Sequence, residues 1–290
     1  MTLSATDLME LGSVACDAAN AAARLIARSR PTEVRSKPGE ASEAAQLVSD
    51  VDQASERLLL EHLAPSMDRF GIGMLTEEQP DDGSRHLADA FWCIDPLDGT
   101  LPFVEGQPGF AVSVALVARD GQPLVGVVHD PTTGIVRHAI RDGGAYRNGE
   151  AWTRPTPHSA TPLMVFADRS FLAHPSADQT MIDLEQVAGD LGRPGVRVET
   201  GAGAVMNACQ VLDHSPACYL KLPVARGGGS LWDFAATACL FHELGAVATD
   251  SGGRALDLNR RERTSMGHRG VLFASDADLA SRLRTITPRS

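Results

Sequence analysis

From about residue 161 to the end of the chain, short apolar runs alternate with segments of helical periodicity. The runs LMVFA, VRVET, ACYLKL, GAVAT and VLFA have the length and composition of strands. Helices are expected between them over residues 177–191, 204–212 and 231–243, and a further helix is expected at the C-terminus. Strands that alternate with helices indicate an α/β half.

The first part of the chain has a different order of elements. An amphipathic helix is predicted over residues 5–30, and a second helix is expected to open with a capping box formed by Ser49 and Asp52. The runs FAVSVALVA and LVGVVHD are separated by RDGQP, which predicts an antiparallel hairpin. We therefore expect one compact unit with an α+β lobe over residues 1–155 and an α/β lobe over residues 156–290.

The charge of the chain restricts its partners. Its 37 acidic residues outnumber 26 basic ones, which gives a formal net charge of −11 over 290 residues. A broad basic surface for a nucleic-acid polymer or an anionic membrane is therefore not expected. A small anionic substrate would be repelled on average, and could bind only where a cation or a set of backbone amides reverses the local charge.

The cysteines and the N-terminus indicate a cytoplasmic protein. The five cysteines are odd in number and show no C-x-x-C spacing, so neither a disulfide framework nor a zinc site is predicted. Asp7 and Glu10 stand where a signal peptide needs basic residues, and no window approaches the roughly 18 apolar residues of a membrane span.

The stretch WCIDPLDGT, residues 92–100, sets two aspartates three positions apart at the end of an apolar run. If that run is a buried strand, Asp95 and Asp98 lie at its carboxyl end, where layered α/β proteins usually place their sites. Two carboxylates there repel each other unless a cation lies between them or one takes a proton. The alternative is an Asp-Pro turn that Asp98 and Gly99 complete.

Further acidic residues could reach the same place. Glu77 and Glu78 end the apolar stretch MLTEE, although such a pair is more often a solvated loop. Asp233 lies in SLWD before a strongly apolar helix, where Ser230 as N-cap and Asp233 at the third position also make an ordinary helix start.

Four carboxylates, from Glu77, Asp95, Asp98 and Asp233, form an all-oxygen donor set. Such hard ligands suit Mg²⁺ or Mn²⁺ and disfavour zinc. Two ions about 3.5 to 4 Å apart can polarise a phosphoryl group and activate a water. If a helix begins at Gly99-Thr100, its free N–H groups offer a cradle for phosphate oxygens.

These motifs resemble the inositol monophosphatase family, the lithium-sensitive, magnesium-dependent phosphatases. WCIDPLDGT matches the family pattern W-x-x-D-P-[IL]-D-G-T, TEEQ matches G-E-E, LVSDVDQASE matches L-V-T-x-x-D-x-x-x-E, and SLWDFAATACLFHELGA matches W-D-x-A-A followed by E-A-G-G. The resemblance covers most of the chain. It implies a layered αβαβα sandwich of the α/β (α+β) class, and a homodimer.

The resemblance also assigns roles to individual residues. It implies that Glu77, Asp95 and the carbonyl of Leu97 hold one metal ion. Asp95, Asp98 and Asp233 would hold a second ion, and Glu77 would help to place a third.

The remaining implied roles concern the attacking water and the phosphate. Thr100 with Asp52 resembles the pair that orients or deprotonates the water, while the Gly99 and Thr100 amides take the phosphate oxygens. The implied mechanism is a direct in-line displacement without a phosphoenzyme.

Several positions depart from the family pattern. Gln46 replaces an aspartate, and Arg226 stands where inositol-specific members carry a glutamate that contacts a sugar hydroxyl. A cation there would suit a second phosphate or a carboxylate better than a neutral polyol, although a surface arginine in a glycine-rich loop is the alternative. The further candidates for substrate contact are Lys221, Gly203 and Ala204.

The sequence therefore predicts Mg²⁺-dependent hydrolysis of a small soluble phosphate monoester, such as inositol monophosphate, with two or three ions and possible substitution by Mn²⁺. A 3'(2'),5'-bisphosphate nucleotidase, a histidinol-phosphatase or a sugar phosphatase of the same superfamily is the alternative. A catalytically silent metal-binding protein with the same fold is the alternative outside the enzymes.

Overall fold

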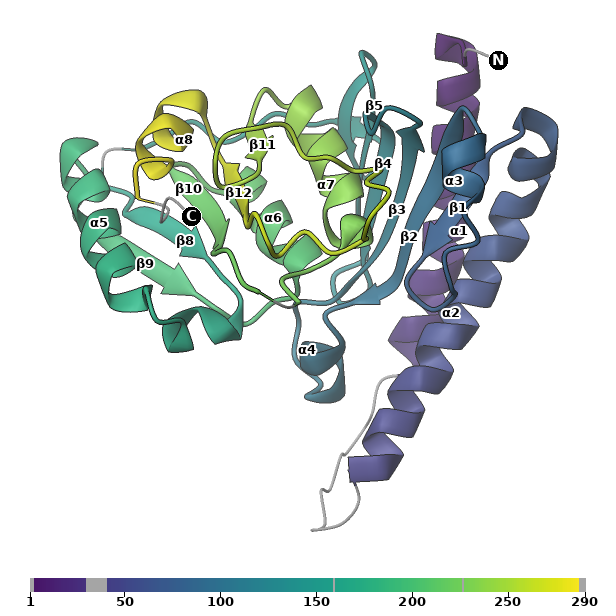
Figure 1. Ribbon diagram of the computed structural model, residues 1–290, viewed down its shortest axis with the longest axis horizontal. Helices are drawn as coiled ribbons and strands as arrows, with labels where there is room; N and C mark the ends of the chain where they lie inside the picture. Colours follow the sequence, from purple (N-terminus) through teal and green to yellow (C-terminus); the bar gives the residue numbers. More distant parts are fainter. Residues whose placement is uncertain (1–2, 30–40, 159, 226, 287–290) are drawn as a thin grey trace.

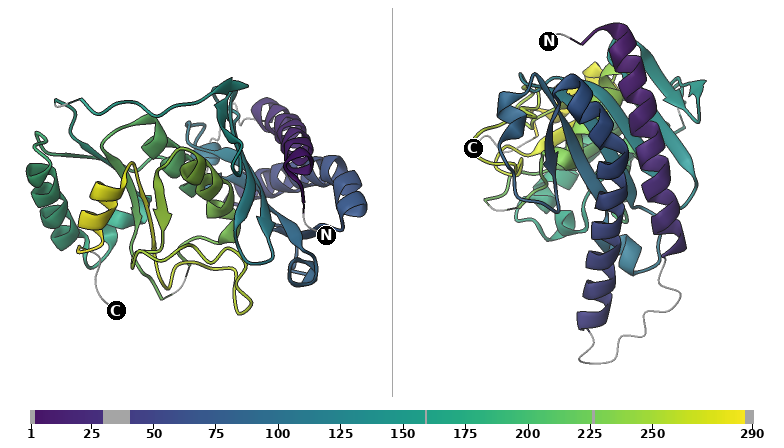
Figure 2. Two further views of the ribbon diagram at one scale, coloured as in Figure 1. Left: turned by 90° about the horizontal axis from the view of Figure 1, so that it is seen from above. Right: turned by 90° about the vertical axis from the view of Figure 1, so that its right-hand side faces the viewer.

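The computed structural model describes residues 3–29, 41–158, 160–225 and 227–286. Its elements form five layers, in which two sheets alternate with three layers of helices (Figure 1). The view from above in Figure 2 shows the two long N-terminal helices outside the first sheet and α5 and α8 outside the second. The layered αβαβα arrangement predicted from the sequence is thereby confirmed, and the division of the chain near residue 155 stays a prediction.

The first layer consists of helices α1 (Ala5–Arg28) and α2 (Ala41–Phe70), which lie side by side against the first sheet (Figure 2, right). Ser4 caps α1, because its side-chain oxygen accepts the Asp7 N–H while the Asp7 carboxylate accepts the Ser4 N–H. The predicted start of α2 at a Ser49–Asp52 capping box is wrong. Both residues lie inside a helix that begins at Ala41, since the ASEAAQ segment consists mostly of good helix formers.

The second layer is a seven-stranded sheet within the described residues, with the strands in chain order. Strands β1 and β2 are parallel and the later pairs are antiparallel, including the predicted hairpin of β3 and β4. The sequence reading did not identify β5, β6 and β7. The strands are β1 (Gly73–Thr76), β2 (Ala90–Asp98), β3 (Ala111–Ala118), β4 (Pro123–Asp130), β5 (Ile135–Ile140), β6 (Gly144–Arg147) and β7 (Glu150–Ala151).

Helices α6 (Ala204–Asp213) and α7 (Leu231–Glu243) form the middle layer. Helix α7 packs on β3 and β4 of the first sheet, and α6 packs on β8 and β10 of the second. Both helices are almost wholly apolar on the sides that meet the sheets, so the largest core cluster of the protein surrounds them.

The fourth layer is the second sheet, with the strand order β11-β12-β10-β8-β9. Strands β9, β8 and β10 run parallel, and β12 is antiparallel to β10 and β11. Its strands are β8 (Leu163–Phe166), β9 (Val196–Glu199), β10 (Ala217–Lys221), β11 (Val247–Thr249) and β12 (Val271–Ala274).

Helices α5 (Ala177–Asp190) and α8 (Ala277–Leu283) cover the outer face of the second sheet as the fifth layer. The short helices are α3 (Ser84–Leu87), α4 (Thr100–Val104) and the 3₁₀ helix η1 (Arg169–Ala173). All five cysteines are unpaired, as predicted. Among the described helices, none combines the length and the apolarity that a membrane span requires.

Candidate metal and active site

A bulge in β2 brings the two aspartates of WCIDPLDGT to one side of the strand. Asp95 pairs with Ser113 and Asp98 pairs with Ala111, so three steps along β2 face two steps along β3. In a regular strand, residues three apart point to opposite faces. The extra residue between Asp95 and Asp98 changes this parity, because a bulge places one unpaired residue in the strand.

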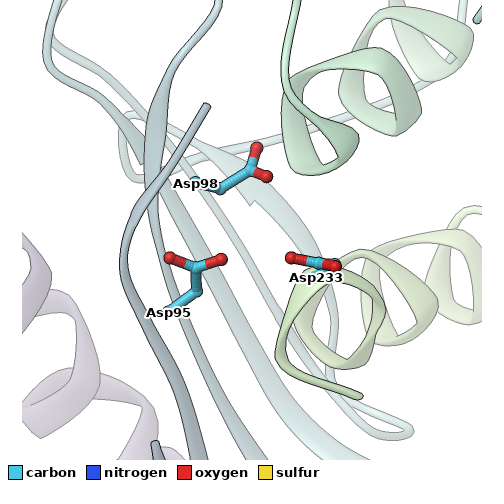
Figure 3. Close-up of side chains that lie close together, drawn as sticks. All are labelled: Asp95, Asp98 and Asp233. Atoms are coloured by element: carbon cyan, nitrogen blue, oxygen red, sulfur yellow. The ribbon is translucent and has the colours of Figure 1, made fainter. Parts of the chain in front are cut away.

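Asp95, Asp98 and Asp233 converge in the structure (Figure 3). One carboxylate oxygen of each lies within 4.8 Å of those of the other two. Asp95 and Asp98 come from β2, and Asp233 comes from the first turn of α7. The side chains face one another across the gap between the two elements, as the close-up shows. Three of the four predicted carboxylates are therefore brought together from two distant parts of the chain.

The Asp98 carboxylate is held by the start of α6. Its two oxygens accept hydrogen bonds from the Ala204 N–H at 3.1 Å and the Val205 N–H at 2.9 Å. A Cβ atom on Gly203 would lie 2.4 Å from Asp98 Oδ2, so only glycine permits this close approach. Gly203 and Ala204 thus contact Asp98, and their predicted contact with substrate stays a prediction.

Asp233 has the structural role that the sequence suggested for it. Its Oδ2 accepts the Ser230 N–H at 2.6 Å at the start of α7. Asp95 is also oriented by the backbone, because its Oδ1 accepts the Leu97 N–H at 3.0 Å. Each carboxylate keeps further lone pairs, so these hydrogen bonds orient the acids without excluding a metal ion.

Burial and mutual repulsion make the cluster costly without a cation. Asp95 is 1% exposed and Asp98 is 7% exposed. Burial raises the pKa of Asp95 well above its usual range, and the charges of Glu77, Asp98 and Asp233 raise it further. Burial likewise raises the pKa of Asp98, with Asp233 as the next cause. These shifts are those expected for acids gathered to bind a cation.

Glu77 follows β1 at the mouth of the cluster. Its N–H donates to the Ile94 carbonyl at 3.2 Å, which continues the parallel pairing with β2 and sets Glu77 beside Asp95. Desolvation, followed by the charge of Asp233, raises the pKa of Glu77 to about 7. Glu77 therefore interacts electrostatically with Asp95 and Asp233, although it lies outside the closest set of three aspartates.

Asp52 lies on α2 near Glu77 and is 7% exposed. Desolvation raises its pKa to about 8, and the charges of Glu78, Glu77 and Glu56 contribute in that order. The hydroxyl of Ser55 donates to the Pro96 carbonyl at 2.8 Å, which ties α2 to the bulge that carries the aspartates. A carboxylate that binds a proton near neutral pH is suited to acid-base chemistry.

Gly99 and Thr100 begin α4, as predicted. Gly99 adopts a left-handed backbone with φ 84°, and Thr100 is the first helical residue and is exposed to solvent. Leu97 is buried between the two aspartates of β2. The roles of these three residues toward metal or phosphate stay predictions.

Lys221 ends β10 and forms an ion pair that the sequence did not predict. Its Nζ lies 2.7 Å from Asp168 Oδ2, and the Tyr219 hydroxyl donates to Asp168 Oδ1 at 2.9 Å. Its positive charge acts to lower the pKa values of Asp98 and Asp233, against the larger effect of burial. The other candidate cation for the substrate, Arg226, lies outside the described residues. Gln46, which replaces the aspartate of the family pattern, lies in α2, and its side chain is not among those described.

The acidic cluster fits a hard divalent cation. The donor atoms are carboxylate oxygens, with no sulfur or imidazole nitrogen among them. Such donors match Mg²⁺ or Mn²⁺. The raised pKa values agree with this, since burial and mutual repulsion disfavour the charged forms of these acids and a cation would relieve that repulsion.

Sequence comparison places this site in a known context. The sequence model of the inositol monophosphatase family matches residues 7–287. The chain belongs to the inositol monophosphatase family. It is therefore a phosphatase of a metal-dependent family, and the silent metal-binding alternative is not supported.

Individual relatives agree with this membership. The inositol-1-monophosphatase of Rhizobium meliloti (strain 1021) is 28% identical over 248 residues, which cover 84% of each chain. The Nus factor SuhB of Escherichia coli (strain K12) is 30% identical over 256 residues, 83% of this chain and 85% of the relative. A solved inositol monophosphatase from Zymomonas mobilis superposes with a TM-score of 0.72 at 21% identity over 98% of both chains, which shows the shared fold.

Two contributions to the site of this inositol monophosphatase family member were missed from the sequence. Asp168 follows strand β8, and the rule that sites lie at carboxyl ends of strands could have identified it. The backbone N–H of Val205 holds Asp98, and no side-chain pattern signals such a contact.

Proposed function

We propose that the protein hydrolyses a small phosphate monoester in a Mg²⁺-dependent reaction. The observation that carries this proposal is the convergence of Asp95, Asp98 and Asp233 within 4.8 Å at the meeting point of β2 and α7. The first sheet contributes two of these acids and the middle layer of helices contributes the third. The membership of a phosphatase family supports the choice of a phosphate ester as substrate.

The protein's own carboxylates would hold the ions. Glu77, Asp95 and the Leu97 carbonyl form one proposed ligand set, and Asp95, Asp98 and Asp233 form the second. When bound, divalent ions at such a site supply positive charge that polarises a phosphoryl group and makes a water more acidic. Mn²⁺ is expected to substitute, because it shares the preference for oxygen ligands.

Asp52 and Thr100 are the residues proposed to handle the attacking water. Asp52 lies close enough to Glu77 for their charges to interact, and its position is fixed by the Ser55 hydrogen bond to the bulge. Thr100 is an exposed residue at the start of α4. We propose that the pair orients the water and that Asp52 takes its proton, while the N–H groups of Gly99 and Thr100 receive the phosphate oxygens.

Three further properties are proposed from the family resemblance. They are inhibition by lithium, assembly as a homodimer and a cytoplasmic location. Titration of the activity with LiCl and sedimentation of the purified protein would test the first two directly, and fractionation of cells of the source organism would test the third.

The test is phosphate release from inositol 1-phosphate with Mg²⁺ and with excess EDTA, alongside the melting temperature under both conditions. We expect turnover only with Mg²⁺, and a rise in melting temperature on its addition, since an ion that binds only the folded state stabilises it. Asp190→Asn, at the exposed end of α5, is the matched control and should behave as wild type. Unchanged hydrolysis and unchanged melting temperature on Mg²⁺ addition would contradict the proposal.

A further inference from the structure

A pocket of about 300 Å³ lies between η1, the carboxyl end of β10 and the loop that follows it. Much of its wall is apolar, and two charged side chains lie in it. The apolar lining comes from Phe171, Leu220, Leu222 and Val224, the charged lining comes from Asp168 and Lys221, and Ser170, His174 and Gly228 complete the described lining.

The pocket borders the acidic cluster. Lys221 lies close enough to Asp98 and Asp233 to act on both carboxyl groups. Its Nζ also lies 5.6 Å from the centre of the Phe234 ring, and Phe234 directly follows Asp233 in α7. A phosphate ester whose phosphate sits at the acidic cluster would therefore have room for its alcohol part in this pocket.

Lys221 is unusual in the composition of the chain. Of the 26 basic residues, only Lys37 and Lys221 are lysines, and the rest are arginines. Its side chain is 15% exposed, and among the described residues that line the pocket it is the only lysine or arginine. A compact ammonium group differs from a planar guanidinium in size and in hydrogen-bond geometry.

The hydrogen bonds around Lys221 leave donor capacity for a ligand. Asp168 engages one N–H of the ammonium and accepts the Tyr219 hydroxyl on its other oxygen. An ammonium group has three donors, so the pair with Asp168 positions the group without using all of them. An anionic oxygen in the pocket could accept one of the others as a charge-assisted hydrogen bond.

The apolar walls favour some alcohols over others. The side chains of Phe171, Leu220, Leu222 and Val224 cannot form hydrogen bonds to ring hydroxyls. Besides Asp168 and Lys221, the described lining offers only Ser170 and His174 as polar side chains, so a neutral polyol that enters the pocket loses water from more hydroxyl groups than these side chains can pair. An alcohol with an apolar body and one anionic group can use the walls and the ammonium group together.

We propose that Lys221 selects phosphate monoesters whose alcohol part carries a second anionic group, a carboxylate or a second phosphate, over esters of neutral polyols. The inference rests on the proposed phosphatase function. It makes Lys221 a specificity-determining residue that contacts the alcohol part of the substrate, with Asp168 as the residue that positions it.

The experiment compares kcat/KM within two pairs of substrates that differ by one anionic group. The first pair is 3-phosphoglycerate and glycerol 3-phosphate, which tests a carboxylate. The second is adenosine 3',5'-bisphosphate and adenosine 3'-phosphate, which tests a second phosphate. The wild type is expected to prefer the anionic member of at least one pair by about tenfold or more, as a charged hydrogen bond typically provides. This comparison needs no variant.

Variants then assign the preference to Lys221. Lys221→Met should lower the ratio of the kcat/KM values within the preferred pair by about tenfold or more, and Lys221→Arg should keep most of that ratio because the charge remains. Arg282→Met, which removes one positive charge from α8 on the outer layer, is the matched control and should keep the wild-type ratio. If Lys221 had a purely structural role, Lys221→Met would lower kcat/KM for both members of a pair alike and leave the ratio of the two values unchanged.

The outcomes separate the two proposals. If the wild type hydrolyses none of these esters, nor inositol 1-phosphate, with Mg²⁺ present, the proposed function fails. If it hydrolyses both members of each pair equally well, or if Lys221→Met keeps the wild-type ratio, only the selection by Lys221 is overturned. Equal loss of the ratio in Lys221→Met and Lys221→Arg would likewise overturn a selection based on charge.

Discussion

Replacing Asp95 by asparagine should have opposite effects on stability with and without metal. Asparagine keeps the Oδ1 atom that accepts the Leu97 N–H, so the local geometry of the bulge is retained. The substitution removes one negative charge from a site where carboxylate oxygens lie within 4.8 Å of one another. The metal-free protein should therefore gain stability, while the metal-loaded protein loses a ligand.

The size of the gain can be bounded. Two unit charges 4.8 Å apart repel by about 3.5 kcal/mol at an effective dielectric constant of about 20. The carboxyl group can escape this repulsion by taking up a proton, so the destabilisation cannot exceed the free energy of protonating an ordinary aspartate, which at pH 8 is roughly 5.5 kcal/mol. We expect Asp95→Asn to raise the free energy of unfolding in EDTA at pH 8 by about 3 to 5 kcal/mol. At pH 5 the same limit is about 1.5 kcal/mol, so the gain should shrink.

Urea unfolding followed by circular dichroism, in EDTA and in saturating Mg²⁺, measures both effects. In EDTA at pH 8 the variant should be the more stable protein, and in Mg²⁺ the order should reverse. Turnover should fall by more than about 100-fold, because even partners outside the ligand shell of a metal typically contribute 10- to 100-fold. A variant that is less stable than wild type in EDTA at pH 8 would refute the repulsion on which this reasoning depends.

Three further substitutions test other parts of the site. Asp52→Asn should remove part of the decline in the stability of the metal-free protein between pH 4 and pH 8. The pKa of Asp52 in the folded protein, about 8, lies above its ordinary value of 3.8, so the stability that depends on this group is present at low pH and is lost as pH rises through the folded pKa. Unfolding curves of the wild type and the variant, recorded at pH 4 and at pH 8, should therefore differ only at pH 8. Gly203→Ala should destabilise the protein by about 1 to 3 kcal/mol in urea unfolding, because its Cβ would meet Asp98 Oδ2 at 2.4 Å, and unchanged stability would contradict the close approach. Ser55→Ala should weaken Mg²⁺ binding in calorimetric titration and lower the free energy of unfolding by about 1 to 2 kcal/mol, since it leaves the buried Pro96 carbonyl without this donor. An unchanged titration would show that the hydrogen bond between α2 and the bulge does not position the metal ligands.

Much of the fold could be predicted because local patterns and tertiary packing agree. The alternation of apolar runs and helical segments after residue 161 matches β8 to α8 closely, and the RDGQP turn predicts the hairpin of β3 and β4. The start of α2 was misplaced, because a pattern that suits a cap also occurs inside helices. Strands β5 to β7 were missed because they are short and only partly buried, with several polar residues.

The candidate site divides in the same way. The spacing of Asp95 and Asp98 and the position of Asp233 could be read from the chain, and the structure brings the three together. The bulge that turns both β2 acids to one side could not be foreseen, since its position depends on the pairing with β3. The pair of Lys221 and Asp168 was likewise hidden, because it requires β8 and β10 to be neighbours although α5, β9 and α6 separate them in the chain.

The carboxylate at the start of α7 has two uses, and this affects how distant relatives should be interpreted. Asp233 accepts the Ser230 N–H, so an aspartate at that position would be retained for helix stability even in a descendant that had lost its chemistry. Asp95 contributes less to the architecture and more to the repulsion. Among divergent homologues, the residue at position 95 should therefore be the better indicator of which proteins are still enzymes.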